Sequence, residues 1–573
     1  MIHLQRVFRF SILLLAVLTS SLTSYGQNTG KSKKADSQLE IGRAIQVFRS
    51  VLAGVETLYV DTVDIKGISA RGINTMLSQL DPYTEYMTDN ESKDFIFMTT
   101  GAYGGIGAYI QEKDSAVYVQ MPMPGTPAEK SGLKMGDKFV VIEGVPVVPA
   151  TATKVSGLLK GQVGTKVKVK ILRLGETKER EFTLTRDNVV VDQVVHRGIY
   201  RDNIGYIRLS SFTNKSAEDV RKAYNELNST RKLKSLILDL RGNGGGVMDD
   251  AIKILGMFLP EKTLVLYTEG KLPETSQKYY TTDKPIDTNI PVVVLINGGS
   301  ASASEIVSGA MQDLDRGVVL GSKSFGKGLV QSTRPLPNKG ILKVTIARYY
   351  IPSGRCIQQL DYSHRNPDGS VASVPDSLAN QFKTKNGRIV KDGGGIRPDL
   401  EIQDEILPVS VFNMIRGGYI FEFANKLFVN RKGTAAPQSV QDIGVTDKDF
   451  EDFLTYLEEQ KFEYGKLSLN ALNRLRELAE FEGYKEQSKE AFKELEKALS
   501  PSLRKDLAQH KDMIISQLRS SLASHYFGMS GQYTVGLESD PTFEKALEIL
   551  SNKETYRKLL TPQRDSKNIK VQK

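Results

Sequence analysis

The sequence predicts a multidomain α/β protein, with a β-rich domain inserted ahead of an α/β core and helical regions at both ends. Three observations support this fold class. The chain has 573 residues, too many for one hydrophobic core. Apolar segments that each run into a glycine turn and then a helix indicate a parallel α/β sheet. Short strand-like segments between Gly and Pro turns precede this part, and helical sequence rich in Lys, Glu and Leu follows it.

The composition excludes several classes of protein. Hydrophobic residues make up 40% and charged residues 25%, as in an ordinary folded protein. The net charge is +10, but basic and acidic residues are interleaved without a long basic block, so we expect no nucleic-acid partner. The only cysteine is Cys356, which excludes an internal disulfide, and the five histidines are scattered. We therefore expect neither a metal nor a cofactor.

The N-terminus predicts export. Basic residues precede a short apolar run, residues 10–18, and small residues follow up to Gly26. This order is typical of a secretory signal peptide over residues 1–26, so we expect a periplasmic or cell-envelope location. The run is too short to span a bilayer comfortably. An uncleaved membrane anchor remains the alternative.

Residues 27–100 are predicted to form a polar linker followed by helices. An apolar seam with alternating spacings of four and three residues indicates the first helix. The seam consists of Ile41, Ile45, Phe48, Leu52, Val55 and Tyr59. A second helix is expected over Ile68–Leu80. The seam packs either within its own domain or against a second subunit.

A compact β-rich domain is predicted over residues 101–187. Its strand-like segments alternate with turns, and two short helices interrupt them. The expected strands are Ala108–Gln111, Val117–Met121, Phe139–Ile142, Val167–Leu174 and Arg180–Leu184, and the expected helices are Pro127–Ser131 and Ala152–Leu159.

The α/β core is predicted over residues 188–405. Buried strands at Ser235–Leu240 and Pro291–Ile296 each enter a glycine turn and then a helix, and a third strand follows at Val318–Gly321. Ligands in such sheets bind at the carboxyl ends of the strands, where this sequence concentrates its glycines. The remaining residues, 406–573, are predicted to form a helical packing or oligomerisation domain.

A nucleophile is predicted where the second of these strands meets its helix. Small residues at this junction allow a sharp turn that exposes one side chain at the helix N-terminus, as in a nucleophile elbow. The helix dipole there favours developing negative charge. Three serines, Ser300, Ser302 and Ser304, are chemically plausible at this stage, although serine is also a common helix cap.

The base is predicted to be a lysine, because no histidine lies nearby in the sequence. Burial lowers the pKa of a lysine and lets it accept a proton. Lys327 is flanked by glycines that permit close approach, Phe325 can desolvate its amine, and Gln331 can hold the amine in place. Backbone N–H groups would stabilise the oxyanion, one from Ala303 and another from the glycine turn 242–246.

A phosphate-binding loop is the rival interpretation of the lysine segment. Gly321 and the pair Gly326-Lys327 have the spacing of that motif. The next residue is Gly328, however, where Ser or Thr should hold magnesium, and a strand-like segment follows instead of a helix. We therefore reject nucleotide binding.

Three segments together, 238–246, 299–305 and 325–331, resemble a known family. It is the C-terminal processing peptidases, also called tail-specific or carboxy-terminal proteases. Further matches lie at Leu80–Thr84, Gly354–Gln358 and Gly395–Asp399. The resemblance implies a protease core of the ClpP/crotonase-like type.

The same resemblance implies the roles of individual residues. It places the nucleophile at Ser302, the base at Lys327 and the supporting glutamine at Gln331. One oxyanion donor is implied at Gly245, beside the N–H of Ala303.

The resemblance also identifies residues 101–187 as a PDZ domain. The N–H groups of Gly105, Ile106 and Gly107 would capture a terminal carboxylate. The bound peptide would add as a strand beside Ala108–Gln111. The facing helix would offer apolar side chains at Val155, Leu158 and Leu159.

The sequence thus predicts an exported serine endopeptidase that binds free protein C-terminal tails and works through an acyl-enzyme. Two rivals are a PDZ adaptor with an inactive core and a non-proteolytic acyl-transfer enzyme or hydratase. A homodimer and an adaptor protein stay open as partners. Whether the PDZ domain activates or inhibits the enzyme also stays open.

Overall fold

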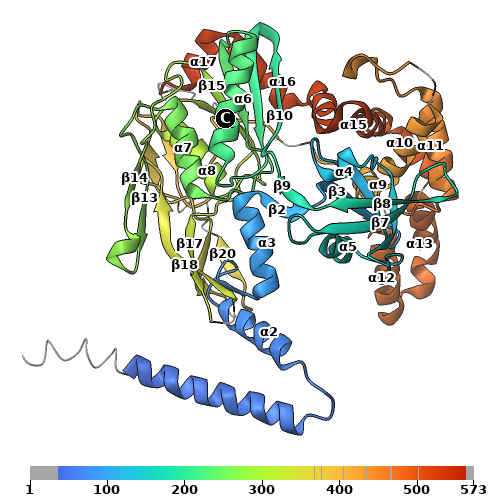
Figure 1. Cartoon of the computed structure of the whole chain (residues 1–573), viewed down its shortest axis with the longest axis horizontal. Helices are drawn as coiled ribbons and strands as arrows, with labels where there is room; N and C mark the ends of the chain where they lie inside the picture. Colours follow the sequence, from blue (N-terminus) through green and yellow to red (C-terminus); the bar gives the residue numbers. More distant parts are fainter. Residues whose placement is uncertain are drawn as a thin grey trace, which may run out of the picture. The chain divides into compact units, whose positions relative to one another are not determined.

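The computed structural model describes residues 36–562, except 338, 367, 374, 376, 378, 404, 432, 434, 465, 466 and 501. The predicted signal peptide lies outside the described residues. The chain divides into two compact units, Met1–Thr88 with Arg334–Lys343, and Asp89–Thr333 with Val344–Lys573 (Figure 1). Within the described part, no helix is both long and apolar enough to cross a membrane.

The described part of the first unit starts with a helix over residues 36–58. α2 (Ile65–Leu77) follows, capped by the Asp64 carboxylate, which accepts the N–H of Gly67 at 3.0 Å. β1 (Glu85–Met87) then pairs antiparallel with residues 341–343. The predicted seam lies on this helix except for Tyr59. Ile41, Ile45 and Phe48 are exposed, whereas Leu52 and Val55 are half-buried.

The core of the second unit is a six-stranded sheet. Its first two strands are antiparallel and all others are parallel, which confirms the predicted α/β class. The strand order is β10 (Val194–Tyr200), β11 (Ile204–Leu209), β12 (Ser235–Asp239), β15 (Val292–Ile296), β16 (Val318–Gly321) and β23 (Leu400–Glu401).

Helices cover both faces of this sheet, so β12 and β15 are buried at every residue. Leu236 and Leu238 point to one face, and Ile237 between them points to the other. The first face packs on α6 (Ser216–Thr230), α7 (Met248–Phe258) and α8 (Ala303–Asp313). The second packs on α16 (Pro541–Ser551) and α17 (Lys553–Leu559), so the end of the chain completes the core.

A second sheet carries part of the candidate site. In the second unit it comprises β13 (Leu264–Gly270), β14 (Lys278–Tyr280) and the parts of β17 (Leu329–Pro335) and β18 (Ile341–Tyr350) that lie outside residues 334–343. Two hairpins follow, formed by β19 (Leu360–Arg365) with β20 (Val371–Ser373) and by β21 (Gln381–Lys383) with β22 (Ile389–Lys391). Short 3-10 helices lie at η1 (Arg201–Asn203), η2 (Pro273–Thr275) and η3 (Val440–Asp442).

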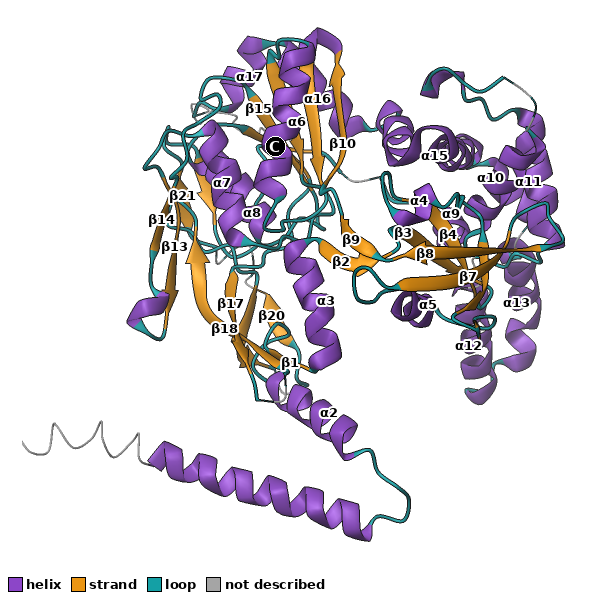
Figure 2. Ribbon diagram, in the orientation of Figure 1, coloured by secondary structure: helices purple, strands orange, loops and turns teal. Residues whose placement is uncertain are grey.

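The predicted PDZ region folds as an antiparallel sheet (Figure 2), and its buried side chains form an apolar core of their own. The strand order is β3 (Ala108–Lys113), β4 (Ala116–Pro122), β5 (Lys138–Ile142), β7 (Lys166–Leu172) and β8 (Glu179–Thr185), with β6 (Val145–Pro146) beside β5. Its helices are α4 (Pro127–Lys130) and α5 (Ala152–Leu159). β3 is an edge strand.

The two ends of this region meet. α3 (Asp89–Thr100) leads into β2 (Ala102–Gly105), which pairs antiparallel with β9 (Asp187–Val190). Because the chain enters and leaves at one place, the region is an insertion ahead of the core, as the sequence predicts.

The helical region after residue 405 contacts both the PDZ region and the core. Its helices are α9 (Val409–Arg416), α10 (Tyr419–Asn430), α11 (Asp447–Glu459), α12 (Leu467–Phe481), α13 (Lys485–Leu499), α14 (Leu503–Ala508) and α15 (Lys511–Glu538). α15 is interrupted at Gly528, where φ is 62°. Ser524, before the break, donates to the sulfur of Met135 in the PDZ region, and Ser530, after it, contacts His196 of β10.

Candidate active site

Three loops leave the carboxyl ends of three adjacent parallel strands. The glycine turn 242–246 follows β12, the serine turn follows β15, and the lysine loop follows β16. The side chain of Asn297 links the first two, because its Oδ1 accepts the N–H groups of Gly242 at 2.9 Å and of Gly299 at 3.1 Å. The three predicted loops therefore lie together at the carboxyl ends of these strands, where ligands bind in sheets of this kind.

The three serines of the second turn have different environments. Ser300 and Ser304 are fully buried, and their hydroxyls donate to the carbonyls of Leu240 and Asn243, each at 2.8 Å. Ser302 is half-buried and caps α8. Of the three, Ser302 alone combines the helix N-terminus with access to solvent.

The backbone of Ser302 is strained. Its φ is 55° and its ψ is −112°, a conformation that residues with a side chain rarely adopt. Neighbouring bonds hold it: Ala301 N–H donates to the carbonyl of Asn243 at 3.0 Å, and Ser302 N–H donates to Glu305 Oε2 at 2.8 Å. Such strain persists only where the surroundings fix it, and it is common at functional sites.

Glu305 joins the serine turn to the lysine loop. Its Oε1 accepts Ser324 Oγ–H at 2.6 Å and Gly326 N–H at 2.7 Å. Its Oε2 accepts Lys327 N–H at 2.9 Å in addition to the N–H of Ser302. Sequence reasoning gave Glu305 no role. The signal was a glutamate three residues after a helix-capping serine.

Burial raises the pKa of Glu305 to about 7, although hydrogen bonds from Ser324 and from the three backbone N–H groups lower it. An ionised carboxylate only accepts hydrogen bonds, and all four partners are donors. The ionised form therefore matches the site. A protonated carboxyl would add a hydrogen that has no acceptor among these four donors.

Tyr349 forms a second link between the serine turn and the lysine loop, and this link is made through backbone carbonyls. Its side chain is buried on β18, and its hydroxyl lies 2.7 Å from the carbonyl of Lys327 and 3.2 Å from that of Ser302. A hydroxyl donates one hydrogen at a time, so the shorter bond dominates. This residue was also missed from the sequence, which shows no motif around it.

Lys327 is half-buried in a loop that requires its flanking glycine. Gly326 has φ of 88°, and a Cβ there would lie 2.7 Å from the Cβ of Gln359. Phe325, expected to desolvate the amine, is 47% exposed, so its shielding role stays a prediction. Gln331 Nε2 donates to Thr345 Oγ1 at 3.3 Å on the neighbouring strand, and its contact with the amine also stays a prediction.

Gly245 lies directly against the serine turn. Its φ is 96°, and a Cβ there would lie 2.6 Å from the carbonyl oxygen of Ala301 and 2.8 Å from Ser302 Cβ. Its N–H donates to Asn243 Oδ1 at 2.9 Å. Among the described residues, nothing accepts the N–H of Ala303. The two predicted oxyanion donors, the N–H groups of Ala303 and Gly245, are thus adjacent. The N–H of Gly245, however, already donates to a side chain of the protein.

The predicted carboxylate loop of the PDZ region contains two N–H groups, of Ile106 and Gly107, without an acceptor in the described part of the chain. Gly105 lies in the ladder opposite Asp187. Gly107 has φ of 75° and its carbonyl accepts Thr126 Oγ1–H at 2.8 Å, which fixes the loop. On the facing helix, Val155 and Leu159 are fully buried, whereas Leu158 is only half-buried.

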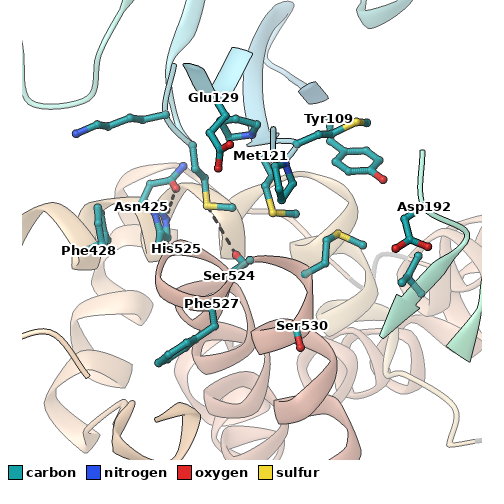
Figure 3. A pocket seen from close by; sticks show the side chains of 18 of the residues that line it. Tyr109, Met121, Glu129, Asp192, Asn425, Phe428, Ser524, His525, Phe527 and Ser530 are labelled. Carbon is teal, nitrogen blue, oxygen red and sulfur yellow. Dashed lines mark hydrogen bonds between the residues drawn. The ribbon is translucent and has the colours of Figure 1, made fainter. Parts of the chain in front are cut away.

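A cavity of about 1280 Å³ lies elsewhere, between the PDZ region, the segment after β9 and the helices α10 and α15 (Figure 3). Its lining includes Tyr109, Met121 and Phe527, and contains none of the predicted site residues. Among residues 36–562, so far as they are described, no cluster of His, Cys, Asp and Glu could hold a metal ion.

Comparisons with known proteins match the same segments. The model of peptidase family S41 matches residues 203–371, the PDZ domain model matches 104–185, and the model "Probable PDZ-protease, C-terminal helical domain" matches 411–550.

Curated relatives are similar over most of their length. A carboxy-terminal-processing protease of Bartonella bacilliformis is 36% identical over 60% of this chain and 78% of its own. The carboxy-terminal processing protease CtpA of Bacillus subtilis is 30% identical over 61% of this chain and 74% of its own. Among solved structures, the photosystem II D1 C-terminal processing protease is 26% identical, covering 63% of this chain and 94% of its own, with a TM-score of 0.34.

Proposed function

This chain belongs to peptidase family S41, the carboxy-terminal processing serine proteases, and from that premise we propose how it works. Ser302 is the nucleophile, Lys327 is the general base, and the PDZ domain binds the free C-terminal tail of an unfolded substrate protein. The observation that carries the assignment is the environment of the three serines. Ser302 is accessible on a strained turn, and the other two are buried with their hydroxyls engaged.

The first half of the reaction forms an acyl-enzyme. Ser302 Oγ attacks the carbonyl carbon of the scissile bond while its proton passes to the neutral amine of Lys327. The N–H of Ala303 donates to the oxyanion. The C–N bond then breaks, the ammonium of Lys327 returns the proton to the leaving amine, and an ester to Ser302 remains. In the second half, water gives a proton to Lys327 and attacks the carbonyl carbon of this ester. The C–O bond to Ser302 then breaks, Ser302 Oγ takes the proton back from the ammonium of Lys327, and the carboxylic acid product leaves.

The second oxyanion donor requires a local exchange. Gly245 N–H donates to Asn243 Oδ1, so the oxyanion must replace that oxygen as its acceptor. Asn243 is otherwise anchored, because its Nδ2 donates to the carbonyl of Leu209 at 2.9 Å and its own carbonyl accepts from Ala301. We propose that, when the substrate binds, the oxyanion takes over the N–H of Gly245 while Asn243 keeps these two bonds.

Tail recognition follows from the edge of the PDZ sheet. β3 has a free edge to which an extended peptide can add as a strand. The N–H groups of Ile106 and Gly107 then bind the terminal carboxylate. Leu158 is the apolar side chain of the facing helix that is left partly open for the last side chain of the tail.

Cleavage of an unfolded substrate with an apolar tail tests this proposal, using one protein with a free C-terminus and the same protein with an amidated one. We expect cleavage of both, with KM at least tenfold higher for the amidated substrate, because the lost carboxylate no longer meets the two N–H groups. Equal KM values would contradict tail recognition while leaving the protease assignment intact. Failure to cleave either substrate would instead favour the adaptor with an inactive core.

Export and assembly complete the proposal. The charged and apolar pattern of residues 1–26 supports export, with a periplasmic or cell-envelope location. The exposed seam of the helix over residues 36–58, including Ile45 and Phe48, supports a homodimer, because its spacing suits helix pairing. Light scattering of Ile45→Glu against wild type tests the dimer. A monomeric wild type would contradict it and leave an adaptor protein as the expected partner.

A further inference from the structure

One contact between the C-terminal helical region and the catalytic core is made by a largely buried acidic residue, Asp540. Asp540 caps α16, and its Oδ1 accepts the N–H groups of Thr542 at 2.9 Å and Phe543 at 3.0 Å. Its other oxygen, Oδ2, lies 2.6 Å from a guanidinium nitrogen of Arg241. Both side chains are largely buried, with 15% and 12% of their surface exposed.

Arg241 is the residue from which the glycine turn departs. It comes between β12 and Gly242, and its guanidinium Nη2 pairs with Asp239 Oδ2 at 2.7 Å as well as with Asp540. Its backbone N–H donates to Asp239 Oδ1 at 2.9 Å. The side chain and the backbone of Arg241 are therefore held by one carboxylate, and the turn that follows lies against Ser302.

The charges around Asp239 balance only when Asp540 is included. Asp239 is fully buried and pairs with two guanidiniums, those of Arg241 and of Arg208, the latter at 2.8 Å. Burial disfavours the charge of Asp239, but the two arginines outweigh burial and hold its pKa well below the usual range. One carboxylate against two guanidiniums leaves one positive charge uncompensated, and Asp540 supplies the missing negative charge.

We propose that Asp540 is a positioning residue for the reaction, acting through Arg241 on the glycine turn 242–246. Without its charge, Arg241 would compete with Arg208 for Asp239 and would turn toward solvent, displacing the turn beside the nucleophile. This inference rests on the proposed function, because it assigns the turn to the oxyanion. It gives the C-terminal helical region a part in catalysis.

Asp540→Asn tests the proposal. Asparagine is as good a helix cap as aspartate, so this variant keeps the cap of α16 and removes only the charge. Asp540→Ser, a second variant, also keeps a capping oxygen and withdraws the side chain from Arg241. Glu544→Gln is the matched control, because Glu544 lies on the same helix and forms an exposed ion pair with Arg201, away from the turn.

We expect Asp540→Asn and Asp540→Ser to lower kcat by about 10- to 100-fold with little change in KM, because a misplaced turn affects the transition state and not tail binding. Glu544→Gln should match wild type. In a background of Arg241→Gln, Asp540→Asn should cause no further loss, since the two act as one unit.

Two results would overturn the proposal. One is wild-type kcat in both Asp540 variants, and the other is an undiminished effect of Asp540→Asn in the Arg241→Gln background. Parallel measurement of Ser302→Ala separates these failures from that of the proposed function. An active Ser302→Ala enzyme contradicts the assigned nucleophile, whereas an inactive one beside unaffected Asp540 variants contradicts this inference alone.

Discussion

Glu305 Oε2 accepts the backbone N–H of Lys327 at 2.9 Å, and the same oxygen accepts the N–H of Ser302. One buried atom thus fixes the main chain at both residues of the proposed dyad. Side chains of serine and lysine are flexible, but their Cα positions here are set by a carboxylate that cannot move without losing four donors. Preorganisation of this kind costs nothing at the moment of reaction.

Glu305→Gln is predicted to lower kcat by roughly 10- to 100-fold, the effect of losing a charged hydrogen-bonded acceptor. The NH₂ group of the glutamine would face hydrogen-bond donors that Glu305 now accepts, so it would repel them. KM should stay near wild type, because Glu305 does not face the tail. Steady-state kinetics measure both, with Glu261→Gln, an exposed glutamate of the same core, as control. An unchanged kcat would contradict the role of Glu305.

The raised pKa of Glu305 predicts that both activity and stability depend on pH. Burial raises the pKa of Glu305 to about 7, so activity should fall as pH drops below about 7, where the carboxyl gains its proton. The contribution of this group to stability has the opposite pH dependence. The unfolded carboxyl titrates near its ordinary value of 4.5, so the folded state binds the extra proton between 4.5 and 7, and stability from this group declines as pH rises through that window. A profile of kcat/KM that is identical in Glu305→Gln would show that another group controls the pH dependence.

Tyr349→Phe should keep the packing of β18 and lose the bond to the carbonyl of Lys327. The net value of one such hydrogen bond corresponds to about a 2- to 10-fold fall in kcat. Tyr350→Phe is the neighbouring control, because its ring stacks on Tyr267. The two variants are measured side by side, and equal kcat values would contradict a role of the Tyr349 hydroxyl in positioning the lysine loop.

Gly245→Ala is predicted to abolish most activity and to lower the melting temperature. A Cβ there meets the carbonyl of Ala301 at 2.6 Å, and the backbone angle is one that alanine adopts only at a cost of about 1–2 kcal/mol. Gly244→Ala is the matched control, since a Cβ at that glycine has open space around it. Activity and thermal unfolding of both variants check this, and a fully active Gly245→Ala enzyme would show that the turn is not packed on the nucleophile.

Acid should loosen the contacts of α15 with the core, made by His196, and with α10, made by His525. Burial, with Arg208 and Arg197 nearby, lowers the pKa of His196 to about 4, and burial does the same for His525. Unfolded histidine binds its proton at 6.5, so the unfolded state gains protons first as pH falls. Stability from each group is present above 6.5 and is lost down to pH 4, by about 3 kcal/mol at most. Urea unfolding across this range measures the loss, and a flat profile would contradict it.

Local pattern predicted much of the fold. The helix predicted after the glycine turn is present as α7 (Met248–Phe258), because its apolar spacing and its preceding turn are both in the sequence. The parallel strands were predictable for a similar reason, since continuous apolar runs mark strands that are covered on both faces. The positions of the serine, lysine and glycine loops followed from their place after three such strands.

The rest of the site depends on contacts between distant residues. Tyr349 and Asp540 lie on elements whose position no local pattern indicates, and each matters only because the fold brings it to a loop. In the sequence, Asn243 is simply part of a glycine turn. Only the folded structure shows that its side chain accepts the N–H of Gly245. That the ring of Phe325 is 47% exposed could not be predicted for a similar reason, because exposure is a property of the whole fold.

The most direct test of the account compares cleavage of one unfolded substrate by wild type, Ser302→Ala and Lys327→Ala, with Ser300→Ala, Ser304→Ala and Lys323→Ala as controls of the same type. The account predicts no detectable cleavage by the first two variants, with folding intact. The controls should keep activity, because the hydroxyls of Ser300 and Ser304 bind backbone groups and Lys323 lies outside the proposed dyad. Cleavage by Ser302→Ala at the wild-type rate would contradict the central claim.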